Sequence, residues 1–416
     1  MPEKPVLLMP EDVQRLLGKD AQRNNILAAK MVAEIVKTTL GPKGMDKMLV
    51  SPTNDITITN DGVTILEEMQ IEHPAARMMV EIAKTQETEV GDGTTTAVMI
   101  AGKLLENAEK LLDKKIHPIV ITKGYRMASE KAQEILKDIA IKITPDDEDV
   151  LKQIAMTAMT GKGAEDSREW FADIIVKAVK QIKDNGKINL GDIKIEKSKG
   201  DGIKDTELIS GIVIDKGAIS RDMPNSVKGS RIALIDFPLE LRNPEIETKI
   251  SISSPEQLHG FIEQEERGIR EMIEKVKLSG ANVIFCQKGI DDFAQYLLAK
   301  EKIYACRRVS RSDMEKISKA TGARIVSNLG ELSPFELGNA DLVEEVRHGE
   351  DFLTYIRGCQ NPKALTILIH GGSEHVIDEI ERAIRDGLGD DACTLQSGFV
   401  VAGGGAVEKE LAKRIR

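Results

Sequence analysis

The sequence is poor in aromatic residues, in cysteines and in unbroken apolar runs. Phe, Trp and Tyr make up 3% of the 416 residues, and no stretch is long enough to span a bilayer. The N-terminus lacks the apolar core of a secretion signal. No two cysteines have the spacing of metal ligands, so we expect reduced and mostly buried thiols at Cys286, Cys306, Cys359 and Cys393. These absences favour a cytoplasmic protein.

The chain also lacks an excess of positive charge. Its 58 Lys and Arg residues are outnumbered by 68 Asp and Glu residues, which gives a net charge of -10. This balance argues against nucleic acid as a main partner, because neutralising phosphates requires clustered cations. Two common phosphate-binding patterns are missing as well: there is no G-x-x-x-x-G-K-[ST] motif, and no G-x-G-x-x-G follows a strand. A standard P-loop enzyme and a dinucleotide-binding fold are therefore disfavoured.

What is present is a globular composition with 41% apolar and 30% charged residues, enough for roughly two to four domains. Apolar residues recur at helical spacing and predict helices over 20–40, 74–90 and 94–113. Between them, Ile56 and Ile58 alternate with threonines and indicate a strand in a small hairpin. The first hundred-odd residues are thus expected to be mostly helical.

The middle of the chain alternates short apolar strands with helices. The segments GIVID and RIALIDF precede a helix of about 255–278, and the alternation continues to a strand at 364–371, followed by a helix at 374–388. Such an alternation predicts a compact α/β domain with a largely parallel sheet. Segments 146–210 and 368–402 are expected to be connectors on either side, so that the α/β domain is inserted into the helical one.

One glycine-rich turn, GDGTTTAVM at 91–99, precedes an expected helix. Helix N-termini attract anions, and Gly91 and Gly93 allow the backbone to approach a phosphate closely. An aspartate would repel that phosphate unless a cation lay between them, and Mg²⁺ prefers one or two carboxylates together with phosphate oxygens. Asp92 is therefore either the magnesium ligand of a nucleotide site or a helix cap, which is a far commoner role.

Three further stretches favour the nucleotide interpretation. TTLGPKGMDK, starting at Thr38, is a second glycine-rich turn beside cations, although Gly-Pro after a helix is usually only a stop signal. Asp61 lies in TNDGVTIL at a strand-to-helix turn, as a functional carboxylate or as part of an ordinary turn. In TGKGAE, Lys162 either reaches a γ-phosphate or lies in a flexible loop.

Together, the segments LGPKGMDKML, NDGVTIL, GDGTTTAV, TGKGAE and GGGAVE make the chain resemble the group II chaperonins, most closely the archaeal thermosome subunits. The resemblance runs along the whole chain. It implies a multidomain α and α/β fold, with a helical equatorial ATP-binding domain, a small intermediate domain and an inserted α/β apical domain with a helical protrusion. The expected boundaries are 1–145 plus 404–416 for the equatorial domain, 146–214 plus 368–403 for the intermediate domain, and 215–367 for the apical domain, with a lid protrusion at about 243–276.

The resemblance implies roles for individual residues by their position. Asp92 is expected to bind Mg²⁺, while Asp61 and Asp386 position and activate the water that attacks ATP. Taken alone, Asp386 would be interpreted as a solvated helix residue. ATP contacts are expected from the glycine turns, the threonines after Asp92 and the lysine of TGKGAE, namely Leu40, Gly41, Pro42, Gly62, Gly93, Thr94, Thr95, Thr96, Lys162, Gly404 and Gly405.

The lid protrusion is expected to contact client proteins. Ile250 and Ile252 alternate on this segment and suit transient contact with unfolded chains, although packing against their own helix explains each of them equally well. The implied function is that of an ATPase chaperone subunit that encloses unfolded proteins, with ATP hydrolysis driving lid closure. Its implied partners are unfolded clients and identical or paralogous subunits in a double ring, with neither nucleic acid nor membrane.

Family members continue beyond the segment GGGAVEKELAKRIR that ends at Arg416. A polypeptide ending there is expected to have a folded apical domain but an incomplete and loosened equatorial domain, with little ATPase activity and no stable double ring. The alternative function is therefore a shortened, non-hydrolysing relative that binds unfolded protein through its apical domain. An ATP-dependent phosphotransferase ranks third, because no small-substrate motif accompanies the nucleotide loops.

Overall fold

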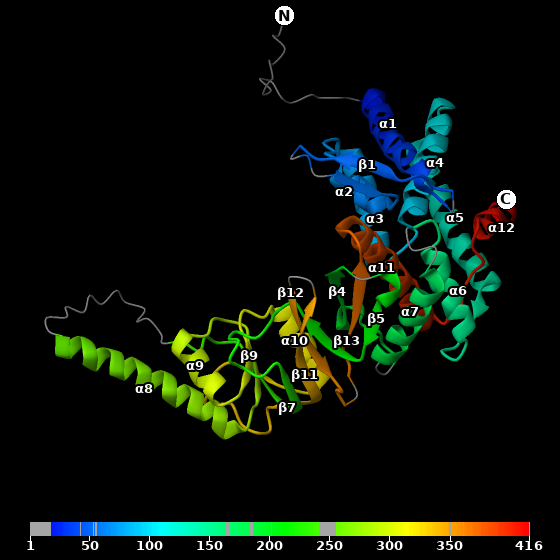
Figure 1. Ribbon diagram of the computed structural model, residues 1–416. Helices are drawn as coiled ribbons and strands as arrows, with labels where there is room; N and C mark the ends of the chain where they lie inside the picture. Colours follow the sequence, from blue (N-terminus) through cyan, green and yellow to red (C-terminus); the bar gives the residue numbers. More distant parts are fainter. Residues whose placement is uncertain are drawn as a thin grey trace, which may run out of the picture. The chain divides into compact units, whose positions relative to one another are not determined.

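The computed structural model describes residues 18–41, 43–52, 54, 56–162, 167–183, 186–200, 202–240, 255–348, 351–360 and 362–415, with the side chains of the longest helix described from residue 263 onward. The chain divides into two compact units (Figure 1). Unit 1 consists of 1–144, 160–162 and 397–416, and unit 2 consists of 145–159 and 163–396.

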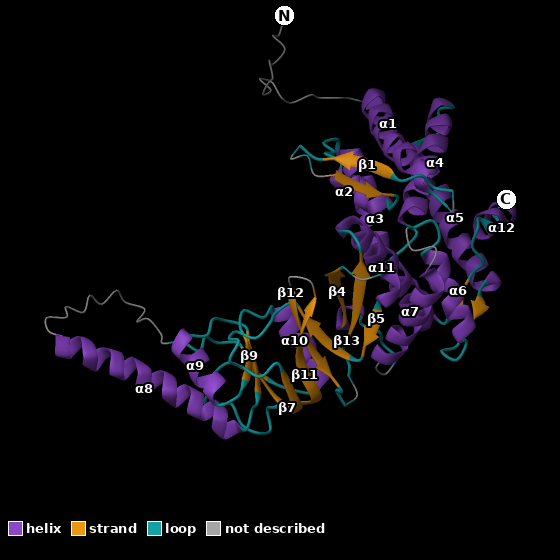
Figure 2. Cartoon of the chain, viewed as in Figure 1, coloured by secondary structure: helices purple, strands orange, loops and turns teal. Residues whose placement is uncertain are grey.

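Unit 1 is mainly helical, with two small two-stranded sheets (Figure 2). In chain order its elements are α1 (Gly18–Val36), η1 (Lys37–Thr39), β1 (Lys47–Val50), β2 (Ile56–Thr59), α2 (Gly62–Glu68), α3 (Pro74–Glu89), α4 (Thr94–Asp113), α5 (Pro118–Ile139), β3 (Ile141–Lys142), β14 (Phe399–Val400) and α12 (Ala406–Arg414). The helices predicted over 20–40, 74–90 and 94–113 are confirmed as α1 with η1, α3 and α4. The predicted hairpin is formed by β1 and β2, whereas α5 had not been predicted.

The core of unit 1 lies where α1, α2, α3 and α4 pack together. Ala29, Val36, Leu66 and Val98 are among its buried residues, and the helical spacing of such apolar residues explains why each helix buries one face. The tightest crossing joins α1 and α4, because a Cβ atom at Gly102 would lie only 2.4 Å from Cβ of Ala33. This packing holds α4, whose first turn follows the GDGTTT segment.

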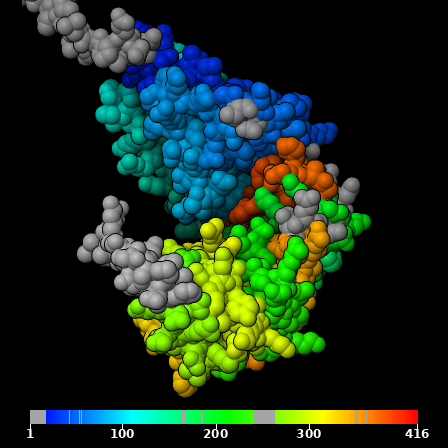
Figure 3. Space-filling model, turned by 60° about the vertical axis from the view of Figure 1, so that its left-hand side comes forward, coloured from blue at the N-terminus to red at the C-terminus, as the bar shows by residue number. Residues whose placement is uncertain are grey.

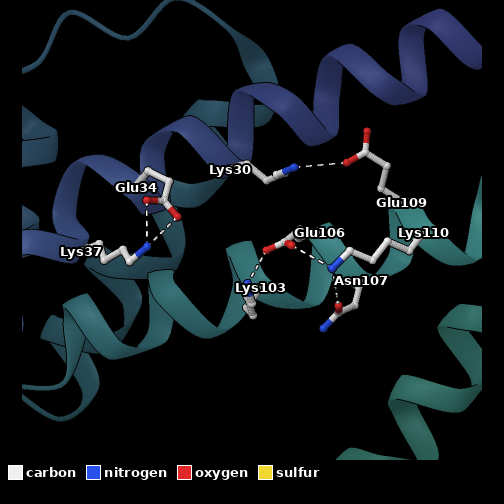
Figure 4. A network of polar contacts seen from close by, with 8 residues as sticks. All are labelled: Lys30, Glu34, Lys37, Lys103, Glu106, Asn107, Glu109 and Lys110. Atoms are coloured by element: carbon white, nitrogen blue, oxygen red, sulfur yellow. Dashed lines mark hydrogen bonds and ion pairs between the residues drawn. The ribbon is translucent and has the colours of Figure 1, made fainter.

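Charged side chains connect the outer surfaces of α1 and α4 (Figure 4). Lys30 Nζ on α1 lies 3.3 Å from Glu109 Oε2 on α4. On α4 itself, Glu106 accepts hydrogen bonds from Lys103 and Lys110, which lower the pKa of Glu106 to about 2. These pairs remain partly exposed to solvent, so they orient the helices but contribute less to stability than the buried core does.

Unit 2 contains a seven-stranded sheet and a three-stranded sheet. In chain order its elements are α6 (Glu148–Ala158), α7 (Arg168–Ile182), η3 (Leu190–Asp192), β4 (Ile193–Lys199), η4 (Ile203–Asp205), β5 (Glu207–Ile209), β6 (Gly211–Ile214), β7 (Ser226–Ile235), α8 (Pro255–Ser279), β8 (Val283–Cys286), α9 (Asp292–Lys300), β9 (Tyr304–Cys306), α10 (Arg311–Thr321), β10 (Ile325–Val326), β11 (Gly338–His348), β12 (Asp351–Arg357), β13 (Leu365–Gly371) and α11 (Glu374–Ser397).

The seven-stranded sheet has the order β6-β12-β11-β7-β8-β9, and β10 pairs with β7. Strands β7, β8, β9 and β10 pair in parallel, as the β-α-β alternation predicted. The prediction of a largely parallel sheet is nevertheless wrong for the other half, where β6, β12, β11 and β7 pair antiparallel. The difference arises from the β11–β12 hairpin, which had not been predicted. A hairpin joins antiparallel strands and needs no crossover helix.

Two cores cover the faces of this sheet, one containing Ile232 and Phe285 and the other containing Ile284 and Ile273. Residues 211–219 and 304–309, far apart in sequence, meet beside β9, where the Ile219 N–H donates to the carbonyl of Ala305 at 3.0 Å. Figure 3 shows green and yellow segments of unit 2 side by side on one surface. The first half of α8 extends away from the sheet in Figure 1.

The three-stranded sheet has the order β4-β13-β5 and packs with α6, α7 and α11 around a core of its own. The predicted strand at 364–371 is confirmed as β13. The helix predicted at 374–388 continues to Ser397, and most of the expected connector 368–402 is therefore helical. Its apolar face, with Ile377, Ile380 and Ile384 buried, extends into a further buried stretch at Leu388 and Ala392.

All four cysteines are free, as predicted. Cys286, Cys306 and Cys359 are buried, and burial raises the pKa of each thiol to about 11. Cys393, on α11, is only partly buried. Across the described part of the chain, none of the helices combines the length and apolar character that a membrane span requires.

Candidate functional site

The first turns of α2 and α4 meet at one point in unit 1. A Cβ atom at Gly62 would lie 2.5 Å from Thr95 Oγ1 and 3.4 Å from Thr94 Oγ1. Only glycine allows the start of α2 to approach the start of α4 so closely, because real Cβ atoms avoid contacts under about 3 Å. Two helix N-termini, each with unpaired N–H groups, are thus brought together.

Asp61 is the N-cap of α2. Its Oδ2 accepts hydrogen bonds from the backbone N–H of Thr64 at 2.8 Å and from the hydroxyl of Thr64 at 2.7 Å. The backbone N–H of Asp61 donates to Thr59 Oγ1 at 3.1 Å. The capping bonds occupy Oδ2 and fix the carboxylate, while Oδ1 has no hydrogen bond within the described residues. Capping and a functional role are therefore compatible at Asp61.

Asp92 is not a helix cap. The N-cap of α4 is Gly93, which has the left-handed φ of 80° and makes no side-chain capping bond. Gly91, with φ of 97°, allows the turn that precedes it. Gln86 Nε2 donates to the carbonyl of Asp92 at 2.9 Å and holds this turn. The carboxylate of Asp92 remains 41% exposed and lies beside the first turn of α4, where Thr94 is buried and Thr95 and Thr96 are partly exposed.

The TGKGAE segment reaches the same place. Lys162 Nζ lies 4.0 Å from Asp92 Oδ1, and the lysine side chain is only 16% exposed. Asn60 Nδ2 donates to the carbonyl of Gly161 at 2.6 Å, which ties this segment to the turn before α2. Three stretches widely separated in sequence, around Asp61, Asp92 and Lys162, therefore form one cluster.

The turn after α1 follows η1, which contacts α4. Gly41 adopts a left-handed φ of 81°, and its carbonyl accepts a hydrogen bond from the N–H of Gly44 at 2.8 Å. Leu40, predicted to contact the nucleotide, is 45% exposed. Pro42, predicted to contact the nucleotide, lies outside the described residues.

The other predicted residues belong to segments outside those that form this cluster. Gly404 and Gly405 form an exposed turn, with φ of 67° and 80°, before α12. Asp386 is partly buried on α11 and belongs to unit 2. Ile250 and Ile252 lie outside the described residues. For these five residues the expected roles remain predictions.

Two residues that position the cluster had not been singled out from the sequence. Asn60 was considered only as part of a turn, and Gln86 only as part of a helix. Both make hydrogen bonds that local sequence patterns do not reveal. Asn60 donates to a residue 101 positions further along the chain, and Gln86 donates to a carbonyl in the turn after α3. The only local signal was the placement of amide side chains next to glycine turns.

The chemistry of the cluster suits a phosphate-bearing ligand more than a bare metal ion. Within the described ranges, no group of three or more His, Cys, Asp or Glu side chains could hold a metal. Mg²⁺ does not need such a cage, because it binds one or two carboxylates and completes its shell with phosphate oxygens and water. Asp92 could supply such a carboxylate, and the adjoining helix N-terminus and Lys162 are groups that attract phosphate.

In a comparison with known proteins, residues 32–416 match the model of the TCP-1/cpn60 chaperonin family. The chain is 57% identical over 415 residues to the thermosome subunit of Methanopyrus kandleri, covering 99% of this chain and 76% of that protein. It is 55% identical over 414 residues to the thermosome subunit beta of Methanothermobacter thermautotrophicus, covering 100% and 77% of the two chains. The thermosome subunit beta of Thermococcus kodakarensis is 56% identical over 416 residues, covering 99% and 76%.

Proposed function

The chain belongs to the TCP-1/cpn60 chaperonin family, and we propose that it is an ATP-dependent chaperone subunit that binds and encloses unfolded proteins. The observation that carries this proposal is the cluster of Asp61, Asp92 and Lys162 at two adjoining helix N-termini. Thermosome subunits are the relatives that match it over nearly its full length. The non-hydrolysing alternative is not favoured, because both carboxylates expected for hydrolysis are present.

In this proposal, each side chain of the cluster has one task. Asp92 holds Mg²⁺, which when bound neutralises phosphate charge. The N–H groups of the first turn of α4, with the hydroxyls of Thr95 and Thr96, bind phosphate oxygens. Lys162 adds positive charge beside them, and the Oδ1 atom of Asp61 accepts a hydrogen bond from the attacking water and orients it. Asp386 is proposed to assist this water, and Gly62, Gly404, Gly405, Leu40 and Gly41 are proposed to shape the nucleotide site.

The proposed domains follow the cores. Unit 1 would form the equatorial domain, since it has its own helical core and contains the cluster. Within unit 2, the three-stranded sheet with its core would form the intermediate domain, and the seven-stranded sheet would form the apical domain. The long helix α8, together with the segment before it, would form the lid protrusion. Assembly into a double ring in the cytoplasm and contact with clients through Ile250 and Ile252 belong to the same proposal.

The test separates binding from hydrolysis. Asp92→Ala removes the proposed metal ligand and should weaken Mg·ATP binding, measured by calorimetry. Asp61→Asn keeps an oxygen that can cap α2 but removes the charge, so folding and ATP binding should be retained. Hydrolysis in a phosphate-release assay should fall by roughly two orders of magnitude or more, as expected for loss of a water-orienting group.

The matched control is Asp291→Asn. Asp291 also caps a helix, with its Oδ1 accepting from the N–H of Phe293 at 2.8 Å, but it lies in unit 2 on α9. This variant should hydrolyse ATP at the parent rate. If Asp61→Asn hydrolysed ATP as fast as Asp291→Asn does, Asp61 would be a structural cap only and its assignment would be wrong.

A further inference from the structure

A second candidate site lies in unit 2 and includes none of the residues assigned above. A cavity of about 250 Å³ opens between the loop at 216–219 and the end of β9. The described residues that line it are Lys216, Gly217, Ala218, Ile219, Arg307 and Arg308. Half of these residues are cationic, and none is acidic or aromatic. In a chain of net charge -10, such a concentration of positive charge around one hollow calls for a physical explanation.

The three cations are not used in ion pairs. Lys216, Arg307 and Arg308 are exposed, and within the described part of the chain no carboxylate lies within ion-pair distance of any of them. The contrast with their surroundings is direct, because Arg311 on the following helix pairs with Glu315 at 3.1 Å. Acidic groups beside the lining are Asp215, which precedes Lys216 in the chain, and Glu345, whose carboxylate accepts a hydrogen bond from the N–H of Ala218.

The wall formed by the 216–219 loop is held in place by buried polar groups. The hydroxyl of Thr354 donates to the carbonyl of Lys216, and the thiol of Cys306 donates to the carbonyl of Gly217 at 3.3 Å. The Ile219 N–H donates to the carbonyl of Ala305 at 3.0 Å. Thr354 and Cys306 are both fully buried, so the loop is anchored to the sheet beneath it.

The opposite wall is fixed by the backbone. Arg308 has a left-handed φ of 55°, which is uncommon for a residue other than glycine. Its N–H donates to the carbonyl of Lys288 at 3.0 Å, and the next N–H, of Val309, donates to the carbonyl of Cys286 at 3.0 Å. These bonds tie the strained turn to the end of β8. Strain that the surroundings maintain is found preferentially where a side chain must be aimed at a ligand.

We propose that this cavity binds a small phosphate-bearing anion. Arginine recognises phosphate through a planar fork of N–H donors, and two arginines with a lysine match the charge of a doubly or multiply ionised phosphate better than that of one carboxylate. A volume of about 250 Å³ falls below the usual range for drug-sized ligands. Without an aromatic side chain in its lining, the cavity has no stacking surface for a nucleobase. Inorganic phosphate, pyrophosphate or a small phosphorylated metabolite fits these limits.

The experiment localises binding of pyrophosphate to the full chain by hydrogen–deuterium exchange. Peptides covering 211–223 and 303–312 should exchange more slowly when pyrophosphate is added. In the Arg307→Gln/Arg308→Gln variant this protection should be lost, with at least a tenfold weaker affinity, because charge-assisted hydrogen bonds are removed. Arg311→Gln, which removes an arginine already paired with Glu315, should behave as the parent does.

Several readouts keep the outcome decisive. Lys216→Gln changes the opposite wall of the cavity and should also weaken protection of the two peptides. This single variant keeps the proposal testable if the double arginine variant does not fold. Protection of the 88–98 peptide reports binding at the proposed nucleotide loop. The cavity variants should leave that protection unchanged. Failure of the cavity proposal can therefore be told apart from failure of the proposed ATPase site. No protection of 211–223 and 303–312 in the parent would overturn the proposal. Protection there by a glutamate-rich peptide but not by pyrophosphate would also overturn it and would assign the cavity to acidic polypeptide.

Discussion

At the scale of single residues, Gly62 is the point on which the proposed nucleotide site depends most directly. A methyl group there would overlap Thr95 Oγ1, at 2.5 Å. We predict that Gly62→Ala pushes α2 away from α4, destabilises unit 1 by about 1–3 kcal/mol, as overpacking does, and weakens ATP binding. Urea unfolding followed by circular dichroism and calorimetric titration with Mg·ATP would measure both effects.

Gly124→Ala is the control for this substitution. Gly124 lies on the exposed side of α5, and a Cβ atom there would have nothing within 4 Å. Alanine is favoured over glycine inside a helix by about 1 kcal/mol, so this variant should be slightly more stable and bind ATP normally. Equal behaviour of the two variants would show that the close approach at Gly62 does not constrain the site.

Asp391 gives a prediction about pH. It is fully buried on α11, and neither of its carboxylate oxygens has a hydrogen bond to a residue that the structure describes. Burial, with a smaller effect from Asp390, raises the pKa of this carboxyl to about 8. The unfolded chain ionises at about pH 4, so between about pH 4 and pH 8 the folded form holds a proton that the unfolded form has lost. The contribution of Asp391 to the stability of unit 2 is therefore full below about pH 4 and declines as the pH rises toward 8.

Asp391→Asn should remove this decline and raise stability at pH 8 by about 5 kcal/mol, since the pKa of this carboxyl differs by about 4 units between the folded and unfolded chain and each unit is worth about 1.4 kcal/mol. Urea unfolding at several pH values would measure it through Trp170, the single tryptophan of the chain, which lies in unit 2. Asp390→Asn, on the same helix but only partly buried, should keep most of the pH dependence. A parent protein with pH-independent stability from 4 to 8 would contradict the prediction.

The sequence predicted which turns carry the candidate side chains, because glycines beside Asp61 and Asp92 are a local pattern. It did not predict that Lys162 would lie 4.0 Å from Asp92 or that Asn60 would hold the loop of Gly161. Those relations depend on how distant segments pack, and single-sequence patterns contain no record of such distances. The pairing of residues far apart in the chain became visible only in three dimensions.

At the scale of elements, the crossing of α1 and α4 determines where the first turn of α4 lies. Gly102 leaves no room for a side chain, since its Cβ would lie 2.4 Å from Cβ of Ala33. We predict that Gly102→Ala forces the two helices apart and destabilises unit 1 by about 1–3 kcal/mol, despite the higher helix propensity of alanine. Urea unfolding measured beside Gly124→Ala tests this, and a stabilised Gly102→Ala variant would show that the crossing tolerates a methyl group.

The elements that sequence patterns predicted share one property: an apolar face with an uninterrupted period. Helices α3 and α4 match the predicted ranges 74–90 and 94–113 to within a residue. The β11–β12 hairpin escaped prediction because its strands carry charged residues such as Glu344, Glu345 and Arg347 on the less buried positions. Strand β11 pairs antiparallel with β7, and β12 pairs antiparallel with β6, so this half of the sheet is antiparallel. The periodicity of apolar residues does not indicate the relative direction of paired strands.

At the scale of the whole molecule, each unit has its own apolar core. We predict that urea unfolding occurs in more than one step, because separate cores need not lose their packing together. Fluorescence of Trp170 should follow only the step of unit 2, while ellipticity at 222 nm should follow both. Gly102→Ala should move the other step and leave the Trp170 midpoint in place. Coincident single transitions for both signals would instead mean that the two units unfold as one.

Because three of the four thiols are buried, the protein can be labelled selectively at its fourth cysteine. A thiol alkylates through its thiolate, and Cys286, Cys306 and Cys359 combine burial with pKa values of about 11. A maleimide dye at neutral pH is therefore directed to Cys393 without removing any cysteine. Cys393 lies seven positions after Asp386 on the same helix α11. Dye emission during nucleotide addition would then follow this helix in the unmutated chain.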